Sequence, residues 1–244
     1  MGMNEMIQFF KQISGKLSPT IYAGVQGQTT PQQIAFLRQL QREMKQKSTL
    51  DSPLNELKVV VFDLETTGFY PDKGDQVISI GAVKMVGCQI KESETFYSLV
   101  QSDLPLSEEV STLTNIQESE LRAAPPASDV LIQFIKFINS DILIAHHANH
   151  EQSFMQKMTW DLLRTKFNHR IIDTSFLIRL FNPSFKSLPL EEVCTQCEIE
   201  IKNRHHALGD ATMTAQIWGY FLQQAQIKGF RNLQEVYEYL AKIG

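Results

Sequence analysis

The sequence has no long hydrophobic run and few cysteines, and both absences exclude whole classes of protein. No run of about 18 apolar residues, the length that crosses a membrane, occurs in the chain. The N-terminus also lacks a basic segment followed by an apolar core, as a secretion signal would have. Three cysteines cannot form a disulfide framework, which is typical of a reducing compartment. We therefore predict a cytoplasmic protein without a membrane partner.

The sequence also lacks an excess of positive charge. Lysine and arginine number 23 against 27 aspartates and glutamates, which gives a net charge of −4. A protein that coats nucleic acid by bulk electrostatics needs a basic surface, so this class is disfavoured. A nucleic-acid enzyme stays compatible with the charge, because carboxylates can bind divalent ions that then meet a phosphate.

What the sequence does contain is a pair of acids at the end of an apolar segment. Residues 59–62 are Val-Val-Val-Phe, and Asp63 and Glu65 follow them. Residues two apart in a strand point to the same face, so these two carboxylates converge. Converging carboxylates either share a proton or bind a cation, and oxygen ligands suit Mg²⁺ and Mn²⁺. The alternative is a strand end whose acids reach solvent or cap the next turn.

The chain divides into three parts by pattern. Residues 1–56 contain two amphipathic stretches and are predicted to form an N-terminal helical extension, which either packs on the main domain or docks a protein partner. Residues 57–226 form the main domain, and residues 227–244 are predicted to be a C-terminal helix packing on it. The main domain starts with strands and continues with alternating helices and strands, which predicts an α/β fold.

The predicted elements of the main domain specify its sheet. Strand patterns from residue 57, at 77–83 and at 94–100 favour a three-strand antiparallel meander. Two later strands and five helices predict parallel strands beside it, flanked by helices. The later strands cover 142–145 and 171–172, and the helices cover 128–138, 151–165, 174–181, 188–197 and 208–226.

Three separated segments together resemble a known family. They are Phe-Asp-Leu-Glu-Thr-Thr-Gly at 62–68, Ala-His-His-Ala-Asn-His-Glu at 145–151, and His-His-Ala-Leu-Gly-Asp-Ala at 205–211. In this order they resemble the three exonuclease motifs of the DnaQ-like DEDDh 3′-to-5′ exonucleases, a group with polymerase proofreading subunits and RNase T. The resemblance covers roughly residues 57–225 and implies a ribonuclease H-like fold.

The resemblance implies two-metal hydrolysis of phosphodiester bonds, with catalytic residues Asp63, Glu65, Glu151, His205 and Asp210. Asp63, Glu65 and Asp210 would hold the first of two Mg²⁺ or Mn²⁺ ions, and Glu151 would help to hold the second. His205 would be the general base. The implied substrate is the 3′ end of single-stranded nucleic acid, with DNA favoured and RNA trimming as the alternative. The implied product is a nucleoside 5′-monophosphate.

Further residues follow from the same resemblance. Asn115 stands where the family usually has glycine, and asparagine tolerates the left-handed conformation that this position needs. Asp173 precedes a helical pattern and is predicted to cap it or to lie behind the site. The residues implied to bind the terminal nucleotide are Leu64, Thr66, Thr67, Gly68, Phe69 and His146.

The second motif departs from the family pattern His-Asn-Ala-x-Phe-Asp. In this chain His147 replaces asparagine, His150 replaces phenylalanine and Glu151 replaces the catalytic aspartate. Glutamate keeps the charge but adds a methylene, which moves the carboxylate by about 1.5 Å. The longer side chain either makes a direct metal contact or misplaces the charge, so an attenuated or inactive nucleic-acid-binding module is an alternative function.

A zinc site is a second alternative. Cys194 and Cys197 could join His205 and His206 in a Cys₂His₂ set, and His146 and His150 have helical ligand spacing. Adjacent histidines are an unusual ligand pair, however, and Cys194 falls on the apolar face of a predicted helix. This pattern favours a core cysteine.

Overall fold

The structure is a computed structural model that describes residues 36, 39–40, 49–185 and 187–243. The chain divides into two compact units, residues 1–39 and 40–244, and the elements discussed here belong to the second. Most of the predicted N-terminal extension, residues 1–56, lies outside the described residues. Its role in docking a partner therefore stays a prediction.

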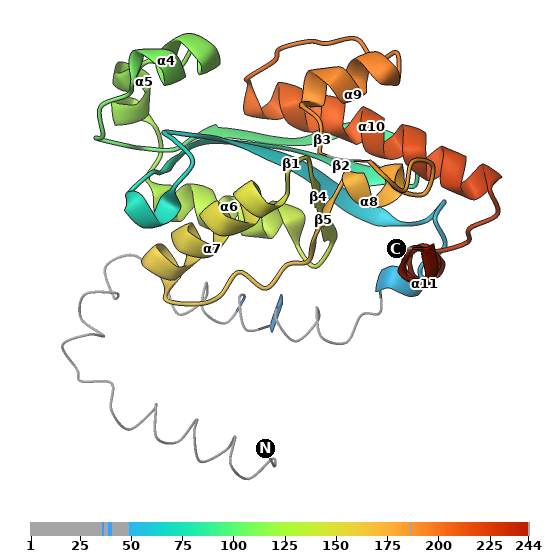
Figure 1. The fold of residues 1–244 in the computed structure, drawn as a ribbon. Helices are drawn as coiled ribbons and strands as arrows, with labels where there is room; N and C mark the ends of the chain where they lie inside the picture. The colour runs from blue at the N-terminus through green and yellow to red at the C-terminus, as the bar shows by residue number, and fades with distance from the viewer. Residues whose placement is uncertain (1–35, 37–38, 41–48, 186, 244) are drawn as a thin grey trace. The chain divides into compact units, whose positions relative to one another are not determined.

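A five-stranded mixed sheet lies at the centre of the second unit, in the order β3-β2-β1-β4-β5 (Figure 1). The strands β1, β2 and β3 form an antiparallel meander, whereas β4 pairs parallel to β1 and β5 parallel to β4. This confirms the predicted mixed sheet. The strands are β1 (Lys58–Thr66), β2 (Val77–Val86), β3 (Gln89–Leu99), β4 (Ile142–Ala145) and β5 (Ile171–Asp173).

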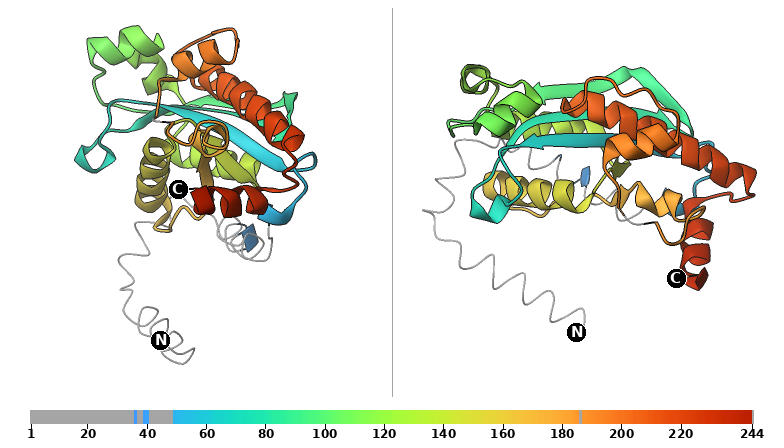
Figure 2. Two further views of the ribbon diagram at one scale, coloured as in Figure 1. Left: turned by 45° about the vertical axis from the view of Figure 1, so that its right-hand side comes forward. Right: turned by 45° about the horizontal axis from the view of Figure 1, so that its top comes forward.

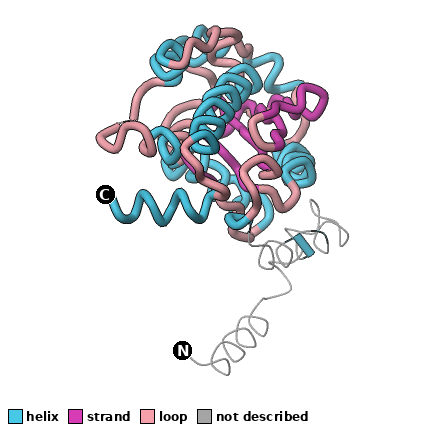
Figure 3. The backbone as a smooth tube through the Cα atoms, turned by 90° about the vertical axis from the view of Figure 1, so that its right-hand side faces the viewer, coloured by secondary structure: helices cyan, strands magenta, loops and turns pink. Residues whose placement is uncertain are grey.

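Helices cover both faces of this sheet (Figures 2 and 3). On one face α10 (Ala207–Ile227) packs against β1 and β2, with α9 (Leu190–Gln196) beside it. The opposite face carries α6 (Ala127–Ile138) and α7 (Asn149–Leu163). The remaining elements are α4 (Glu108–Thr114), α5 (Glu118–Ala123), α8 (Ser175–Ile178), α11 (Leu233–Ile243) and the short 3₁₀ turns η1 (Thr49–Asp51) and η2 (Pro71–Lys73).

The predicted helices of the main domain are found within a few residues of their predicted bounds, but α4 and α5 are not predicted. Both helices are short, so the capping of their ends contributes much of their stability. Ser107 caps α4 by accepting from the Val110 N–H, and α4 ends at Asn115, whose φ of 56° confirms the predicted left-handed conformation. In the described part of the chain, no helix is long and apolar enough to span a membrane.

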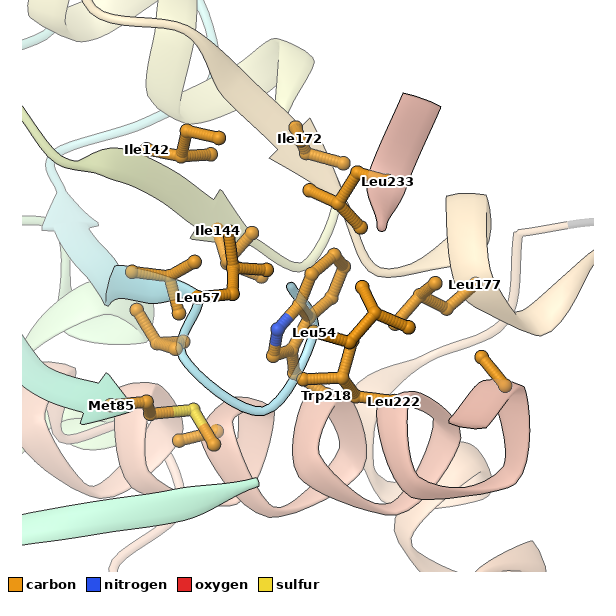
Figure 4. Close-up of a cluster of buried hydrophobic side chains, with 14 of the residues drawn as sticks. Leu54, Leu57, Met85, Ile142, Ile144, Ile172, Leu177, Trp218, Leu222 and Leu233 are labelled. Atoms are coloured by element: carbon orange, nitrogen blue, oxygen red, sulfur yellow. The ribbon is translucent and has the colours of Figure 1, made fainter. Parts of the chain in front are cut away.

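The two faces of β1 carry different side chains, which fixes where its acids point. Val60 and Phe62 face α6, where the Phe62 ring lies 5.6 Å from that of Phe134. Val59 and Val61 belong instead to the cluster around Trp218 of α10 (Figure 4). The alternation continues past the apolar residues, so the acids at 63 and 65 extend from the face that α10 covers.

A glycine allows α10 to lie directly on the sheet. Gly81 of β2 pairs with Asp63 of β1. A Cβ atom at position 81 would lie 2.1 Å from the backbone nitrogen of Leu208 and 2.2 Å from the carbonyl carbon of Ala207. Backbone atoms cannot swing aside as a side chain can, so only glycine permits this approach. The contact places the first turn of α10 over the end of β1.

We expect Gly81→Ala to reduce the free energy of unfolding by about 2 kcal/mol or more, because the added methyl group overpacks two backbone segments. Denaturant titration with a circular dichroism signal would measure this loss. Gly74→Ala is the matched control, since its added Cβ meets no atom within 4 Å and only the φ of 105° is unfavourable. An equal or smaller loss for Gly81→Ala would refute the close-packing argument.

Candidate active site

Three carboxylates from two elements meet at the end of β1. Asp63 and Glu65 come from β1 and Asp210 from the first turn of α10, and one oxygen of each lies within 4.8 Å of the others. Glu65 and Asp210 are buried, while Asp63 is partly exposed. Among the described residues, this is the one cluster of three or more potential metal ligands. The structure therefore brings together the first and third predicted motifs.

Asp210 is held by the loop that precedes α10. Its Oδ2 accepts a hydrogen bond from the backbone N–H of His205 at 3.2 Å and another from the guanidinium of Arg204. Its Oδ1 is buried and has no hydrogen-bond partner. One oxygen is thus fixed by the protein, and the other is left for a ligand.

The fourth acid, Glu151, enters from the first turn of α7. Its side chain is buried, with one carboxylate oxygen that has no hydrogen-bond partner. Glu151 lies outside the group of three oxygens within 4.8 Å. It is nevertheless close enough for its charge to raise the pKa of Asp63. The second motif therefore reaches the same site from the other side.

Burial raises the pKa values of all four acids, and neighbouring carboxylates add to each rise. Burial is the largest cause throughout, and it raises the pKa of Glu65 to about 7 and that of Glu151 to about 8, with neighbouring acids adding to both. The pKa of Asp210 rises to about 6, although Arg204 opposes the rise. The pKa of Asp63 is raised well above its usual range by burial and then by the other three acids. Such a group of carboxyls needs either protons or cations.

The donors fit a hard divalent cation. Glu65, Glu151 and Asp210 each have one buried carboxylate oxygen without a hydrogen-bond partner. Burying a polar oxygen without a hydrogen-bond partner is unfavourable by roughly 2–7 kcal/mol. A metal ion would satisfy these oxygens, and an oxygen-only ligand set suits Mg²⁺ or Mn²⁺.

The predicted general base, His205, lies on the loop before α10 with a φ of 62°. Its Nδ1 is 3.2 Å from a terminal nitrogen of Arg204, and because arginine can only donate, Nδ1 must accept. A neutral His205 in this arrangement carries its proton on Nε2. Burial and the charge of Arg204 lower the pKa of His205, which favours the neutral ring near neutral pH. Its one lone pair is then the one that accepts from Arg204, so Nδ1 must leave Arg204 before it can take up a proton.

The zinc alternative is disfavoured by the positions of its residues. Cys194 is fully buried in an apolar cluster with Leu190 and Val193, as expected for a core cysteine. The ring of His206 stacks on that of Tyr97 with a centroid distance of 4.3 Å. This set therefore offers a worse ligand group than the three carboxylates.

The turn after β1 is held by its own hydrogen bonds. Asp75 accepts from the Thr67 hydroxyl at 3.2 Å and from the Tyr70 N–H at 2.8 Å. The Thr66 hydroxyl donates to the carbonyl of Gly68 at 2.7 Å. A Cβ at Gly68 would lie 2.4 Å from the Asp75 carboxylate, so any larger residue would displace this side chain from its present contacts. The turn is therefore preformed next to the acids.

Two side chains near this turn differ in exposure. Leu64 is buried at 5% exposure, whereas Phe69 is 79% exposed. The Phe69 ring packs edge-on against His150 of α7 with a centroid distance of 5.9 Å. Phe69 thus offers a free aromatic face beside the site, while Leu64 is part of the core.

Residues behind the site hold the start of α7. Asp173 accepts from the backbone N–H of Ala148 and from that of Ser175, both at 2.8 Å. The N-cap residue of α8 is Thr174, so Asp173 matches the predicted alternative of an acid that lies behind the site. His146 is buried, and both ring nitrogens make contacts at 2.8 Å, one with the Thr174 hydroxyl and one with a backbone carbonyl. Its hydrogen-bonding groups are thus used within the protein, and its role toward a nucleotide stays a prediction.

Sequence reasoning does not single out three residues on which this site depends. Gly81 sits in an apolar strand, Asp75 follows a turn, and Arg204 precedes the third motif by one residue. Gly81 meets the distant residues Ala207 and Leu208, whereas Asp75 and Arg204 act mainly on residues fewer than fifteen positions away. The available sequence signal is that Arg204 directly precedes the histidine of the third motif.

Comparison with known proteins agrees with this geometry. A mixed sheet with clustered carboxylates at the end of its central strand defines a nuclease of the ribonuclease H-like class. The family model described as "Exonuclease" matches residues 60–218, which include all four acids and His205. The chain belongs to this family, in its DnaQ-like DEDDh group, and the resemblance noted in the sequence is confirmed.

Two relatives and one solved structure illustrate the match. The chain is 34% identical over 181 residues to a DNA polymerase III PolC-type protein of Caldanaerobacter subterraneus subsp. tengcongensis, covering 74% of this chain and 13% of that one. It is 32% identical over 169 residues to the DNA polymerase III subunit epsilon of Aquifex aeolicus, covering 69% and 82%. The chain therefore spans about an eighth of the PolC-type relative and most of the epsilon subunit.

The fold resembles that of exonuclease X in complex with 5′-overhanging duplex DNA. The TM-score is 0.55 at 19% sequence identity, and the match covers 70% of this chain and 93% of that one. This likeness confirms the predicted ribonuclease H-like fold.

We expect the unfolding free energy of chelator-treated protein to fall by about 1 kcal/mol or more as the pH rises from about 7 to about 8.5. The raised pKa values of Glu65 and Glu151 mean that folded carboxyls keep protons that unfolded ones have lost, so rising pH favours unfolding. Burial lowers the pKa values of His146, His150, His169 and His205. These histidines oppose the trend only weakly, because their unfolded forms are already mostly neutral above the ordinary pKa of about 6.5. Denaturant titration at several pH values measures the slope.

Saturating Mn²⁺ is the control for this measurement, since a bound cation favours the ionised carboxylates and should abolish the loss. A chelator-treated protein that becomes more stable over this pH range would contradict the proposed repulsion among the acids.

Proposed function

We propose that this chain is a metal-dependent 3′-to-5′ exonuclease that removes nucleotides from single-stranded 3′ ends, with DNA favoured over RNA, and releases nucleoside 5′-monophosphates. One observation carries the proposal: Asp63, Glu65 and Asp210 converge within 4.8 Å beside His205, in a chain of the exonuclease family. Proofreading or repair would use such an activity.

The acids divide between two ions in this proposal. Asp63, Glu65 and Asp210 would hold the first, and Asp63 and Glu151 would hold the second. Two bound ions would supply charge neutralisation for the scissile phosphate and activation of the attacking water. His205 would accept the proton of that water at Nδ1, the nitrogen with the lone pair, after this nitrogen has left Arg204; such a role is worth about 10²–10⁴ in rate.

The turn after β1 supports binding of the terminal nucleotide. The Asp75 contacts hold the backbone of Thr66, Thr67 and Gly68 next to the acids, where it can approach a nucleotide closely. The exposed ring of Phe69 can stack on a base, and stacking is worth about 1–3 kcal/mol per base. Stacking of a base on Phe69 favours single-stranded substrates, because their bases are not held in a base pair. The names of the DNA polymerase III relatives favour DNA as the substrate.

We expect Asp63→Ala to lower mononucleotide release by at least about 10³-fold, because it removes the ligand shared by both ions and leaves the water without activation. The assay follows 5′-labelled single-stranded DNA, duplex DNA with a mismatched 3′ end, and RNA, each with Mg²⁺ and with Mn²⁺. We expect digestion of single-stranded DNA to be the fastest.

Asp129→Ala is the matched control, since Asp129 is an exposed acid in the first turn of α6. It should digest the substrates at the wild-type rate. Wild-type protein that releases no mononucleotide from any of the three substrates with either metal would refute the proposed activity.

We expect Glu151→Asp to lower the rate by about 10–100-fold, although it restores the residue usual in the family. Glu151 is buried, and its longer side chain reaches the neighbourhood of Asp63; shortening it withdraws the carboxylate by about 1.5 Å. Single-turnover kinetics on single-stranded DNA would measure the change. A faster Glu151→Asp variant would instead show that Glu151 attenuates this enzyme.

A further inference from the structure

Arg204 contacts three functional groups at once. Its Nε and one terminal nitrogen each lie 3.1 Å from the same carboxylate oxygen of Glu191 in α9. The other terminal nitrogen donates to Oδ2 of Asp210 and lies 3.2 Å from Nδ1 of His205. The side chain is 28% exposed, so it is partly shielded from solvent. No part of the mechanism described above uses it.

The contacts of Asp210 show what Arg204 does to this acid. The Oδ2 atom is satisfied by Arg204 and by the backbone N–H of His205, whereas the Oδ1 atom is buried without a partner. Two donors on one oxygen fix the rotation of the carboxylate. The orientation that results presents Oδ1 as the atom available to a cation.

The contact with His205 has a similar consequence. Because the guanidinium donates to Nδ1, the proton of the neutral ring lies on Nε2, and the ring orientation is fixed relative to Asp210. The backbone of His205 is left-handed, with a φ of 62°, and its N–H donates to Oδ2 of Asp210, the oxygen that Arg204 also contacts. One side chain thus links the third acid to the histidine.

We propose that Arg204 is a positioning residue that orients Asp210 and holds the resting His205 ring beside it, and that Glu191 anchors Arg204 from α9. The metal-binding and base roles of its two targets rest on the proposed function. A planar guanidinium can bind three groups in fixed directions, whereas a lysine ammonium is a point charge. Partners of metal ligands commonly change metal affinity or activity by about 10–100-fold when they are removed.

The decisive variant is therefore Arg204→Lys, which keeps the charge and loses the planar fork. We expect its Kd for Mn²⁺, measured by isothermal titration calorimetry, to rise by about 10-fold. We expect kcat on single-stranded DNA to fall by about 10–100-fold with little change in KM, since Arg204 would act on the ligand and the base rather than on the substrate. Arg231→Lys is the matched control, because Arg231 is an exposed arginine paired with Glu235, and it should leave the Mn²⁺ Kd unchanged.

A double-mutant cycle tests the role of Glu191. Glu191→Ala should weaken Mn²⁺ binding in the same direction, and combining it with Arg204→Lys should add little, because Glu191 acts through Arg204. Glu191 touches neither Asp210 nor His205 in the contacts described above, so this variant also tests the proposal if Arg204→Lys fails to fold. Wild-type Mn²⁺ affinity and kcat in Arg204→Lys, or full additivity in the cycle, would overturn the positioning role.

These outcomes are separate from a failure of the proposed function. Wild-type protein that binds Mn²⁺ but digests no substrate would contradict the exonuclease activity, while the Mn²⁺ Kd of Arg204→Lys would still report on the orientation of Asp210. Wild-type protein that binds no Mn²⁺ would refute both.

Discussion

Repulsion among four acids at the end of β1 is the constraint on which the rest of the structure depends. Asp63, Glu65, Glu151 and Asp210 share a poorly solvated volume, and burial together with their neighbours raises every one of their pKa values. A fold can keep such a group only if the surrounding packing is stable enough to offset it and if a cation can relieve it. The first condition concerns the packing around β1, and the second connects the acids to metal-dependent hydrolysis.

The packing condition is met by the alternation of β1 and by the contact of α10 with the sheet. Valines on one face of β1 join the cluster around Trp218, while Phe62 packs toward α6 on the other. Asp63 and Glu65 lie on the same strand, so the packing of β1 also fixes the position of their backbone. Gly81 then allows the first turn of α10 to approach, which brings Asp210 to a strand that is far away in the sequence. Precision at the site is thus a consequence of core packing.

The second condition, relief of the repulsion by a cation, divides the site into two parts. Asp63, Glu65 and Asp210 form a tight group, oriented on one side by Arg204, whereas Glu151 approaches alone from α7. Asp173, at the end of the edge strand β5, accepts from the N–H of Ala148 at the start of α7. The helix that carries Glu151 is therefore also held by a contact outside the site. A longer acid on a separately anchored helix is consistent with one well-formed ion site and a second that depends on how α7 is placed. Glu151 is thus anchored separately but stays coupled through its charge to Asp63 and Glu65.

The sequence by itself determined the features that depend on neighbouring residues. Strand periodicity placed Asp63 and Glu65 on one face, apolar spacing located the helices of the main domain, and Asn115 adopted the left-handed conformation that its chemistry allows. Only the tertiary structure decided which residues of different elements meet: Gly81 under α10, Arg204 against Glu191 of α9, and Glu151 apart from the other acids. The contact of Asp75 with the Thr67 turn is local, but no sequence pattern indicated it. The short helices α4 and α5 also emerged only in the tertiary structure. The contacts between elements join residues through space, and local propensity carries no information about partners that the chain brings together from far apart.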